Sequence, residues 1–379
     1  LGMRACRGVF RLVLVKTTAR WRFLATLMMA SSFIGCVAHT SSPPASMSPG
    51  SLEVREPSAA QLFSYERQEI PFKNRMLDKE ESSLYRVRYI RFPSIGDNGQ
   101  PDNLVRGKYY ESKLPGRKPM VVVLPIWGRH VYPPEKITAH LLRRSRGHVN
   151  VFQMEGPNHL LDWQGLASAP DEASYLDLWK QGAQREWVAI TDIRRILDWA
   201  KTRPDLDSER IGLVGFSHGA MVAGAVAAQE PRLAATVLVM GGALAHQVLA
   251  QCPLTRSAPA RSKAVTEFGW SPDELEQRLQ PIFAPLDPVS YPGRVDPQRV
   301  LVVEAAQDQC MTETAREALW ESMGRPERIL IPTRHKRAFL GMTPLGLNWL
   351  RHRIGDFLLR TLALPGGIPW DSTTPSNPP

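Results

Sequence analysis

The chain of 379 residues lacks the short motifs that mark most metal and nucleotide sites. It contains neither H-E-x-x-H nor C-x-x-C, so no metal site is indicated, and neither G-x-G-x-x-G nor a P-loop, so no nucleotide cofactor is indicated. Its 4 cysteines are too few for a small protein held together by disulfides. Hydrophobic residues make up 43% and charged residues 22%, an ordinary globular usage that excludes a disordered chain, a collagen-like fibre and a coiled coil.

Acidic residues are absent from the first 35 positions. This segment carries six basic residues, namely Arg4, Arg7, Arg11, Lys16, Arg20 and Arg22, and without it the net charge falls from +10 to +4. The remaining basic clusters are scattered and no nucleic-acid recognition motif accompanies them, so we interpret most of them as solvated faces and expect no nucleic-acid partner. These clusters are Arg143-Arg144-Ser145-Arg146, His335-Lys336-Arg337 and Arg351-His352-Arg353.

The same N-terminal segment has the pattern of an export signal. An apolar run from Phe23 to Gly35 follows the basic stretch; it has the length of a signal's hydrophobic region and is shorter than the roughly 20 residues of a membrane span. Phe33-Ile34-Gly35-Cys36 resembles a bacterial lipobox, which implies a signal peptide over residues 1–35 and a lipid on Cys36. Val37 fits an outer-membrane lipoprotein facing the periplasm. The alternative is a cleaved secretory signal with an incidental Cys36 and a periplasmic or secreted protein.

The rest of the chain divides into three parts. We expect residues 36–84 to comprise the lipidated Cys36, a Ser/Pro-rich tether and an N-terminal extension. Residues 85–364 form the globular domain, and residues 365–379 are a disordered tail rich in Pro, Gly, Ser and Thr.

Within the globular domain, apolar runs alternate with segments of helical period. The expected strands are Tyr85–Phe92, Leu104–Glu111, Met120–Leu124, Val149–Met154, Ile211–Val214, Ala234–Met240, Val300–Val303 and Arg328–Ile331, the first two forming an antiparallel pair. A long helix is expected whose inward apolar stripe runs from Trp187 to Trp199 and which Pro204 ends. Further helices are expected at Gly219–Gln229, Thr312–Met323 and Leu345–Leu362. This order predicts an α/β fold, a mostly parallel sheet with helices on both faces.

A serine on a predicted strand-to-helix turn is the most informative feature. Gly215-Phe216-Ser217-His218-Gly219 matches G-x-S-x-G between an apolar strand and a helix of small residues. A nucleophile elbow needs this context, because a side chain at either glycine would collide with the neighbouring strand or helix. We therefore predict that Ser217 is a catalytic nucleophile.

A serine nucleophile needs a base and a carboxylate that orients the base, here in the chain order Ser, Asp or Glu, His. Asp308 follows the Val300–Val303 strand and is the predicted acid. The alternatives are Glu304, still at the strand end, and Asp287, which fits a turn or a helix cap better.

His335 heads the last strand-to-helix loop and is the predicted base. Its rival is His352, which lies within a predicted helix. The other histidines precede Asp308 in the chain and are therefore out of order.

Two N–H donors should stabilise the oxyanion of the tetrahedral intermediate. The backbone amide of His218 is the first candidate, because it follows the nucleophile at a helix N-terminus. The second should come from Pro125-Ile126-Trp127-Gly128, with Trp127 favoured and Ile126 next; Trp127 could also serve only in packing.

From about Tyr85 to Leu362 the chain resembles the α/β-hydrolase superfamily, and most closely its dienelactone hydrolase, acetyl-xylan-esterase and prolyl-oligopeptidase-like branch. The stretch from Leu197 to Ala220, Asp308 and His335-Lys336-Arg337-Ala338-Phe339 carry the resemblance. It implies a serine hydrolase of the carboxylesterase class, with Ser217, Asp308 and His335 as its triad, a small-molecule or acyl-ester substrate and no cofactor. The alternatives are a non-catalytic envelope lipoprotein that uses the fold as a binding scaffold, and a peptidase of the same fold.

The chain departs from this family in two long segments, Asn158–Tyr175 and Gly242–Arg299. We predict that the second contains an inserted cap, about residues 243–298, over the active site, although it could also be an extra helix pair outside the site. Cys252 in this segment and Cys310 beside Asp308 could form a disulfide in an oxidising compartment. The alternative is two free buried thiols.

Overall fold

The computed structural model describes residues 64–65, 73–77, 80–127, 132–156, 160–253 and 256–362. The predicted signal, Cys36, the tether and the tail therefore lie outside the described residues. Within the described part, no helix is long and apolar enough to cross a membrane.

The described residues form one mixed sheet of nine strands in the order β1-β2-β3-β5-β4-β6-β7-β8-β9. Strand β1 pairs antiparallel with β2, β2 with β3, and β3 with β5. The run β5-β4-β6-β7-β8-β9 is parallel throughout. The bounds are β1 Lys73–Met76, β2 Tyr85–Pro93, β3 Leu104–Ser112, β4 Lys118–Val123, β5 Asn150–Glu155, β6 Leu206–Phe216, β7 Leu233–Val239, β8 Val300–Ala305 and β9 Glu327–Ile331. The predicted α/β class and mostly parallel sheet are confirmed.

All eight predicted strands are present, and the structure adds β1 before them. Strand β1 reads Lys-Asn-Arg-Met and has no apolar alternation, so hydrophobic periodicity could not reveal it. It pairs antiparallel with β2, from Lys73 opposite Arg91 to Met76 opposite Arg88.

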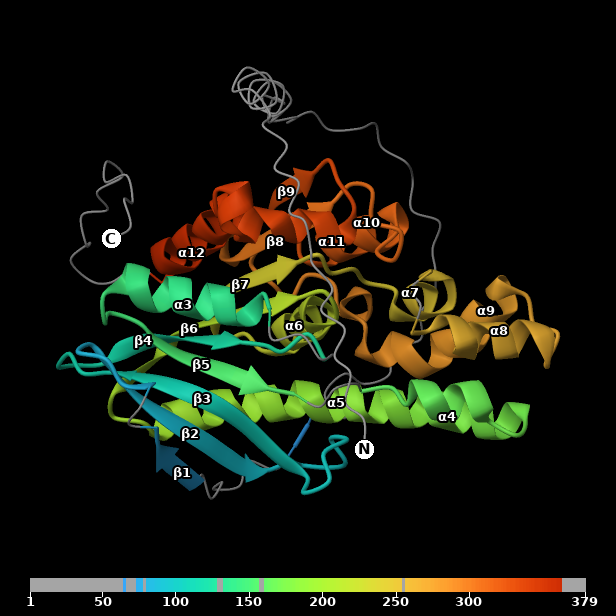
Figure 1. Ribbon diagram of the computed structural model, residues 1–379, viewed down its shortest axis with the longest axis horizontal. Coiled ribbons are helices and arrows are strands. Elements are labelled where there is room, and N and C mark those ends of the chain that lie inside the picture. The colour runs from blue at the N-terminus through green and yellow to red at the C-terminus, as the bar shows by residue number, and fades with distance from the viewer. Residues whose placement is uncertain are drawn as a thin grey trace, which may run out of the picture. The chain divides into compact units, whose positions relative to one another are not determined.

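Helices cover both faces of the sheet. They are α3 Pro134–Ser145, α4 Trp163–Ser168, α5 Glu172–Thr202, α6 His218–Gln229, α7 Ala245–Gln251, α8 Ala258–Thr266, α9 Pro272–Phe283, α10 Glu313–Ser322, α11 His335–Ala338 and α12 Trp349–Thr361. Strand β4 shows why two cores form: Val121 and Val123 join the core beneath α3 and α12, whereas Met120 and Val122 join the core beneath α5 and α6. Figure 1 shows α3 and α12 adjacent to each other, apart from α5.

The predicted cap segment forms helices α7, α8 and α9, which lie together beside the N-terminal half of α5 (Figure 1). An aromatic cluster joins them: the ring of Tyr175 on α5 lies 5.4 Å from that of Phe268 and 5.8 Å from that of Trp270. The Tyr175 hydroxyl also donates a hydrogen bond of 3.0 Å to the carbonyl of Ala260 on α8. These contacts explain why α5 starts at Glu172, well before the apolar stripe expected from Trp187.

The helix expected from Leu345 begins later. Residues Pro344–Gly346 form a separate 3₁₀ turn, η6, and α12 starts at Trp349. Leu347 and Asn348 have φ values of 55° and 54°, in the left-handed region, so a right-handed helix cannot run through them.

Two histidines meet where α3 packs on α12. The His140 and His352 rings lie 4.8 Å apart, edge to face, and Gly355 leaves room for His140, because a Cβ atom there would come within 2.5 Å of the His140 ring. Burial, followed by the charges of His352 and Arg351, lowers the pKa of His140 to about 3.

This pKa predicts acid sensitivity. In the unfolded chain this histidine titrates near pH 6.5, so between pH 6.5 and about 3 the unfolded chain binds more protons than the folded one. The contribution of the neutral His140 to the free energy of unfolding is therefore fully present above pH 6.5 and is lost as the pH falls below it. We expect His140 to lower the free energy of unfolding by about 2 kcal/mol between pH 7 and pH 5. Urea unfolding at both pH values should show this loss in the wild type and a smaller one in His140→Gln. Equal pH slopes in the two proteins would contradict the prediction.

Candidate active site

Ser217 occupies a sharp turn between β6 and α6. Its φ of 53° and ψ of −123° are strained for a non-glycine residue, and its backbone N–H is held by the carbonyl of Val239 at 2.8 Å. A Cβ atom at Gly215 would lie 2.0 Å from the Gly219 carbonyl oxygen, and one at Gly219 would lie 2.3 Å from the Pro125 carbonyl oxygen. Both glycines are therefore required for the turn that presents Ser217.

His335 and Asp308 reach Ser217 from two neighbouring strand ends. Asp308 lies in the loop after β8, and His335 is the first residue of α11, after β9. His335 Nε2 lies 3.1 Å from Ser217 Oγ, and His335 Nδ1 is hydrogen-bonded to Asp308 Oδ2. If Nδ1 carries the proton and donates it to the carboxylate, Nε2 is free to accept the proton of Ser217. The structure thus brings the three predicted residues together in one chain of hydrogen bonds.

The carboxylate of Asp308 is oriented by its own loop. Its Oδ1 accepts the backbone N–H groups of Cys310 at 2.9 Å and Met311 at 3.1 Å, so Oδ2 faces His335. Burial by itself raises the pKa of Asp308, but the hydrogen bond and charge of His335 and the two amides together lower it below its usual value. Asp308 therefore remains a carboxylate that faces His335 Nδ1.

The alternative residues lie in other interactions. Glu304 is fully buried in β8 and pairs with Arg328, with 2.6 Å between Arg328 Nη2 and Glu304 Oε2. Asp287 caps a 3₁₀ helix and accepts the backbone N–H groups of Val289 at 3.1 Å and Ala245 at 2.9 Å. His352 packs against His140 on α3.

The two predicted oxyanion donors lie on neighbouring segments. His218 is the first residue of α6, so its N–H has no acceptor inside the helix. Trp127 follows β4 with a φ of 55°, and its ring centroid lies 5.9 Å from that of His218. The close approach of Gly219 to Pro125 holds this loop against the start of α6. The roles of the His218, Trp127 and Ile126 amides stay predictions, and Gly128 lies outside the described residues.

Glu186 on α5 is a neighbour of the site that the sequence did not reveal. Its Oε2 lies 3.6 Å from His218 Nε2, and the residue is buried. No motif or spacing links the two positions, since only the packing of α5 against α6 brings them together.

A disulfide links the cap to the acid loop. Cys252, at the C-terminal end of α7, is bonded to Cys310 with an S–S distance of 2.10 Å. The sequence left open whether these two cysteines form a disulfide or are free thiols, and the structure contains the disulfide. Because the Cys310 amide holds Asp308, the bridge fixes the cap segment to the loop that orients the carboxylate.

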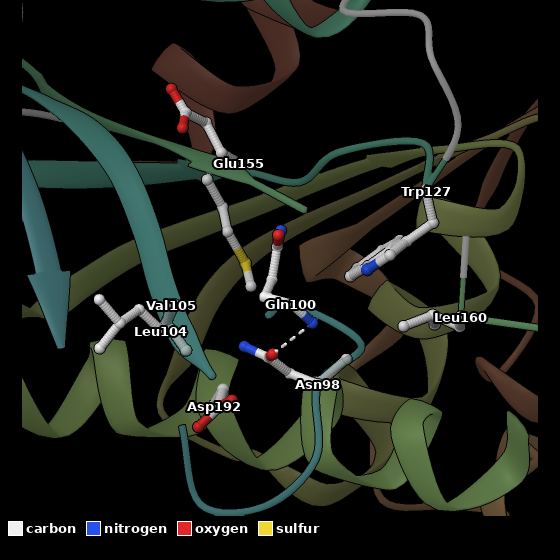
Figure 2. A pocket seen from close by; sticks show the side chains of 10 residues that line it. Asn98, Gln100, Leu104, Val105, Trp127, Glu155, Leu160 and Asp192 are labelled. Atoms are coloured by element: carbon white, nitrogen blue, oxygen red, sulfur yellow. Dashed lines mark hydrogen bonds between the residues drawn. The ribbon is translucent and has the colours of Figure 1, made fainter. Parts of the chain in front are cut away.

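Two cavities lie near these elements, and neither is lined by Ser217, Asp308 or His335. One, of about 10 Å³, lies beside Trp127, Asn98 and Leu160 (Figure 2), and the Trp127 Nε1 atom next to it has no hydrogen-bond partner among the described residues. It is large enough for one water molecule. The other, of about 950 Å³, is an open groove between α5 and the end of the cap, lined by Trp187, Ile282 and Leu286 among others.

Among the described residues, no group of three His, Cys, Asp or Glu side chains could hold a metal ion.

Comparison with known proteins agrees with the fold. The model of the dienelactone hydrolase family matches residues 105–257. An acetyl xylan esterase from Paenibacillus sp. R4 is 16% identical, with a TM-score of 0.55 over 79% of this chain and 92% of that one. Acetyl xylan esterase 1 from Thermoanaerobacterium sp. JW/SL YS485 is 15% identical, with a TM-score of 0.54 over 78% and 89%.

The Pyrococcus horikoshii acylaminoacyl peptidase is 16% identical, with a TM-score of 0.52 over 75% of this chain and 42% of the peptidase. Comparison with curated protein sequences finds no match. The sheet topology and these similarities show that the chain has the α/β-hydrolase fold. Within that fold, residues 105–257 are similar to the dienelactone hydrolase family.

Proposed function

We propose that this protein is a serine hydrolase that cleaves a carboxylic ester through an acyl-enzyme intermediate. The observation that carries the proposal is His335, whose Nε2 lies 3.1 Å from Ser217 Oγ while its Nδ1 binds Asp308. A histidine held in this way can act as a general base toward the serine and as a general acid toward the leaving group.

In the first half-reaction, Ser217 Oγ attacks the ester carbonyl as its proton passes to His335 Nε2. Asp308 stabilises the imidazolium that forms, and the backbone amides of His218 and Trp127 stabilise the oxyanion. The C–O bond to the alcohol then breaks, and the alcohol leaves with the proton from His335. In the second half-reaction His335 deprotonates a water molecule, which attacks the acyl-enzyme and releases the acid with Ser217 restored.

An ester is the proposed substrate in preference to a peptide. The two acetyl xylan esterases align over 89% and 92% of their lengths, whereas the acylaminoacyl peptidase aligns over 42%. The peptidase therefore has more than half of its chain without a counterpart here. The proposed carboxylesterase class names no particular acid or alcohol.

A fluorophosphonate probe tests this proposal, because it reacts only with a serine activated by its base. We expect the probe to label wild-type protein at Ser217, identified by mass spectrometry of the labelled peptide, and labelling to be lost in His335→Ala. Enzyme that takes up the probe should hydrolyse a series of p-nitrophenyl esters of increasing chain length, each far faster than peptide p-nitroanilides.

Two other outcomes of the probe experiment would contradict the proposed esterase activity. Wild-type protein that is folded but takes up no probe would favour a binding scaffold without catalysis. Labelled protein that prefers p-nitroanilides would favour a peptidase of the same fold.

A further inference from the structure

The segment that follows His335 exposes large apolar side chains to solvent. Leu345 and Leu347 are 90% and 83% exposed, Leu340 is 50% exposed and Trp349 is 38% exposed. Leu340 lies on η5 (Phe339–Met342) and Leu345 on η6 (Pro344–Gly346). Leu347 lies between η6 and α12, and Trp349 is the first residue of α12. Water-exposed leucines grouped in this way mark a contact surface.

These side chains belong to one compact turn. A Cβ atom on Gly346 would lie 2.2 Å from the carbonyl oxygen of Leu340, and one on Gly341 would lie 2.8 Å from Trp349 Nε1. The backbone of Leu340 therefore touches the stretch that carries Leu345 and Leu347, and Trp349 lies against the residue after Leu340. The exposed apolar side chains are therefore carried on one short, compact stretch of backbone.

Positive charge borders this patch. Helix α11 runs without a break into η5, so Lys336 and Arg337 precede Leu340 by one helical turn and lie beside it. Both are exposed, and within the part of the chain that the structure describes neither forms an ion pair. From Arg328 to Gly355 the sequence has no Asp or Glu. This stretch of the chain is thus apolar and cationic, and it carries no acidic residue of its own.

We propose that this surface docks the folded domain on an anionic lipid bilayer. The α11–α12 surface, as we call it, consists of Lys336, Arg337, Leu340, Leu345, Leu347 and Trp349. Leucines that enter the interface are removed from water, a tryptophan is favoured at the level of the headgroups, and lysine and arginine are attracted to anionic lipids. The contact does not depend on a lipid at Cys36, and it begins one residue after His335.

A second copy of the chain fits the surface less well. A two-fold dimer would place this patch against itself and bring Lys336 and Arg337 of one copy toward the same cations of the other. Like charges in an interface are repulsive, whereas an anionic bilayer complements them. The charge therefore selects the membrane over self-association.

A fluorescent probe at one site tests docking by this surface in a chain that cannot carry a lipid at Cys36. The full chain with Cys6→Ala and Cys36→Ala leaves only the disulfide-bonded Cys252 and Cys310, so an added cysteine is labelled alone with the environment-sensitive dye NBD. Leu345→Cys is the test site, and Val265→Cys, on α8 and 47% exposed, is the matched control. Vesicles of phosphatidylcholine alone are compared with an equal mixture of phosphatidylcholine and phosphatidylglycerol.

We expect NBD at residue 345 to brighten and shift to shorter wavelength on the anionic vesicles, and nitroxide-labelled lipids to quench it, with no such change at residue 265. Lys336→Gln/Arg337→Gln should weaken the vesicle affinity reported by this probe about thirtyfold, and Leu340→Ser/Leu347→Ser at least about tenfold. An unchanged signal at residue 345, equal signals at the two sites, or a signal that rises with protein concentration without vesicles would overturn the proposal. The last result would show self-association instead.

Discussion

Replacement of Ser217 by alanine should lower kcat/KM for p-nitrophenyl acetate by roughly four to six orders of magnitude. The change removes one oxygen atom, and that oxygen is the atom 3.1 Å from His335 Nε2. Without it no acyl-enzyme forms, and the remaining rate comes from binding and from the oxyanion donors alone. Initial rates at matched protein concentration, with active sites titrated by fluorophosphonate in the wild type, measure the effect.

The fold should survive this substitution. Alanine adds no bulk to a turn whose tight contacts involve Gly215 and Gly219, and the serine side chain makes no hydrogen bond to the backbone at the start of α6. Circular dichroism and thermal unfolding should therefore match the wild type. A folded Ser217→Ala protein that retains activity within tenfold of wild type would remove Ser217 from the mechanism.

Asp308→Asn should have the second largest effect, a loss in kcat of about 10³- to 10⁴-fold. The asparagine carbonyl can still accept the N–H groups of Cys310 and Met311, so the loop should keep its shape. Its amide would then face His335 Nδ1 with a donor, which favours the opposite imidazole tautomer and places a proton on Nε2. A base that is already protonated on this atom cannot take the proton of Ser217.

Glu304→Gln provides the matched control for this prediction. Glu304 is also a buried carboxylate and lies within β8, the strand that precedes Asp308, but it pairs with Arg328 and Arg316 and not with His335. We expect it to lower thermal stability and to change kcat less than tenfold. Equal losses of kcat in the two folded variants would mean that any buried carboxylate change damages the site, and would argue against an orienting role for Asp308.

The three catalytic candidates could be found in the sequence because each stands at a recognisable junction. Ser217 lies between an apolar strand and a helix of small residues, while Asp308 and His335 each follow an apolar strand late in the chain. Carboxyl ends of neighbouring parallel strands meet at one edge of the sheet. Local patterns were therefore enough to predict that these three residues converge.

Other features had no local pattern. Strand β1 is polar and exists through its pairing with β2. Glu186 reaches His218 across two packed helices. The exposed Leu345 looked like the start of an amphipathic helix, and only the left-handed backbone at Leu347 and Asn348 separates it from α12 and leaves it in solvent.

The sequence by itself determined the class of fold and the tight turn at Ser217, because these depend on hydrophobic period and on glycines that the turn requires, and it predicted Asp308 and His335 as the acid and base from their places after late strands. Only the tertiary structure decided which carboxylate faces His335, that Cys252 meets Cys310, and that leucines and cations gather on one surface after α11. The physical reason is sequence separation: Cys252 and Cys310 are 58 residues apart, and the distance between such groups is set by how helices and strands pack, which no local pattern records.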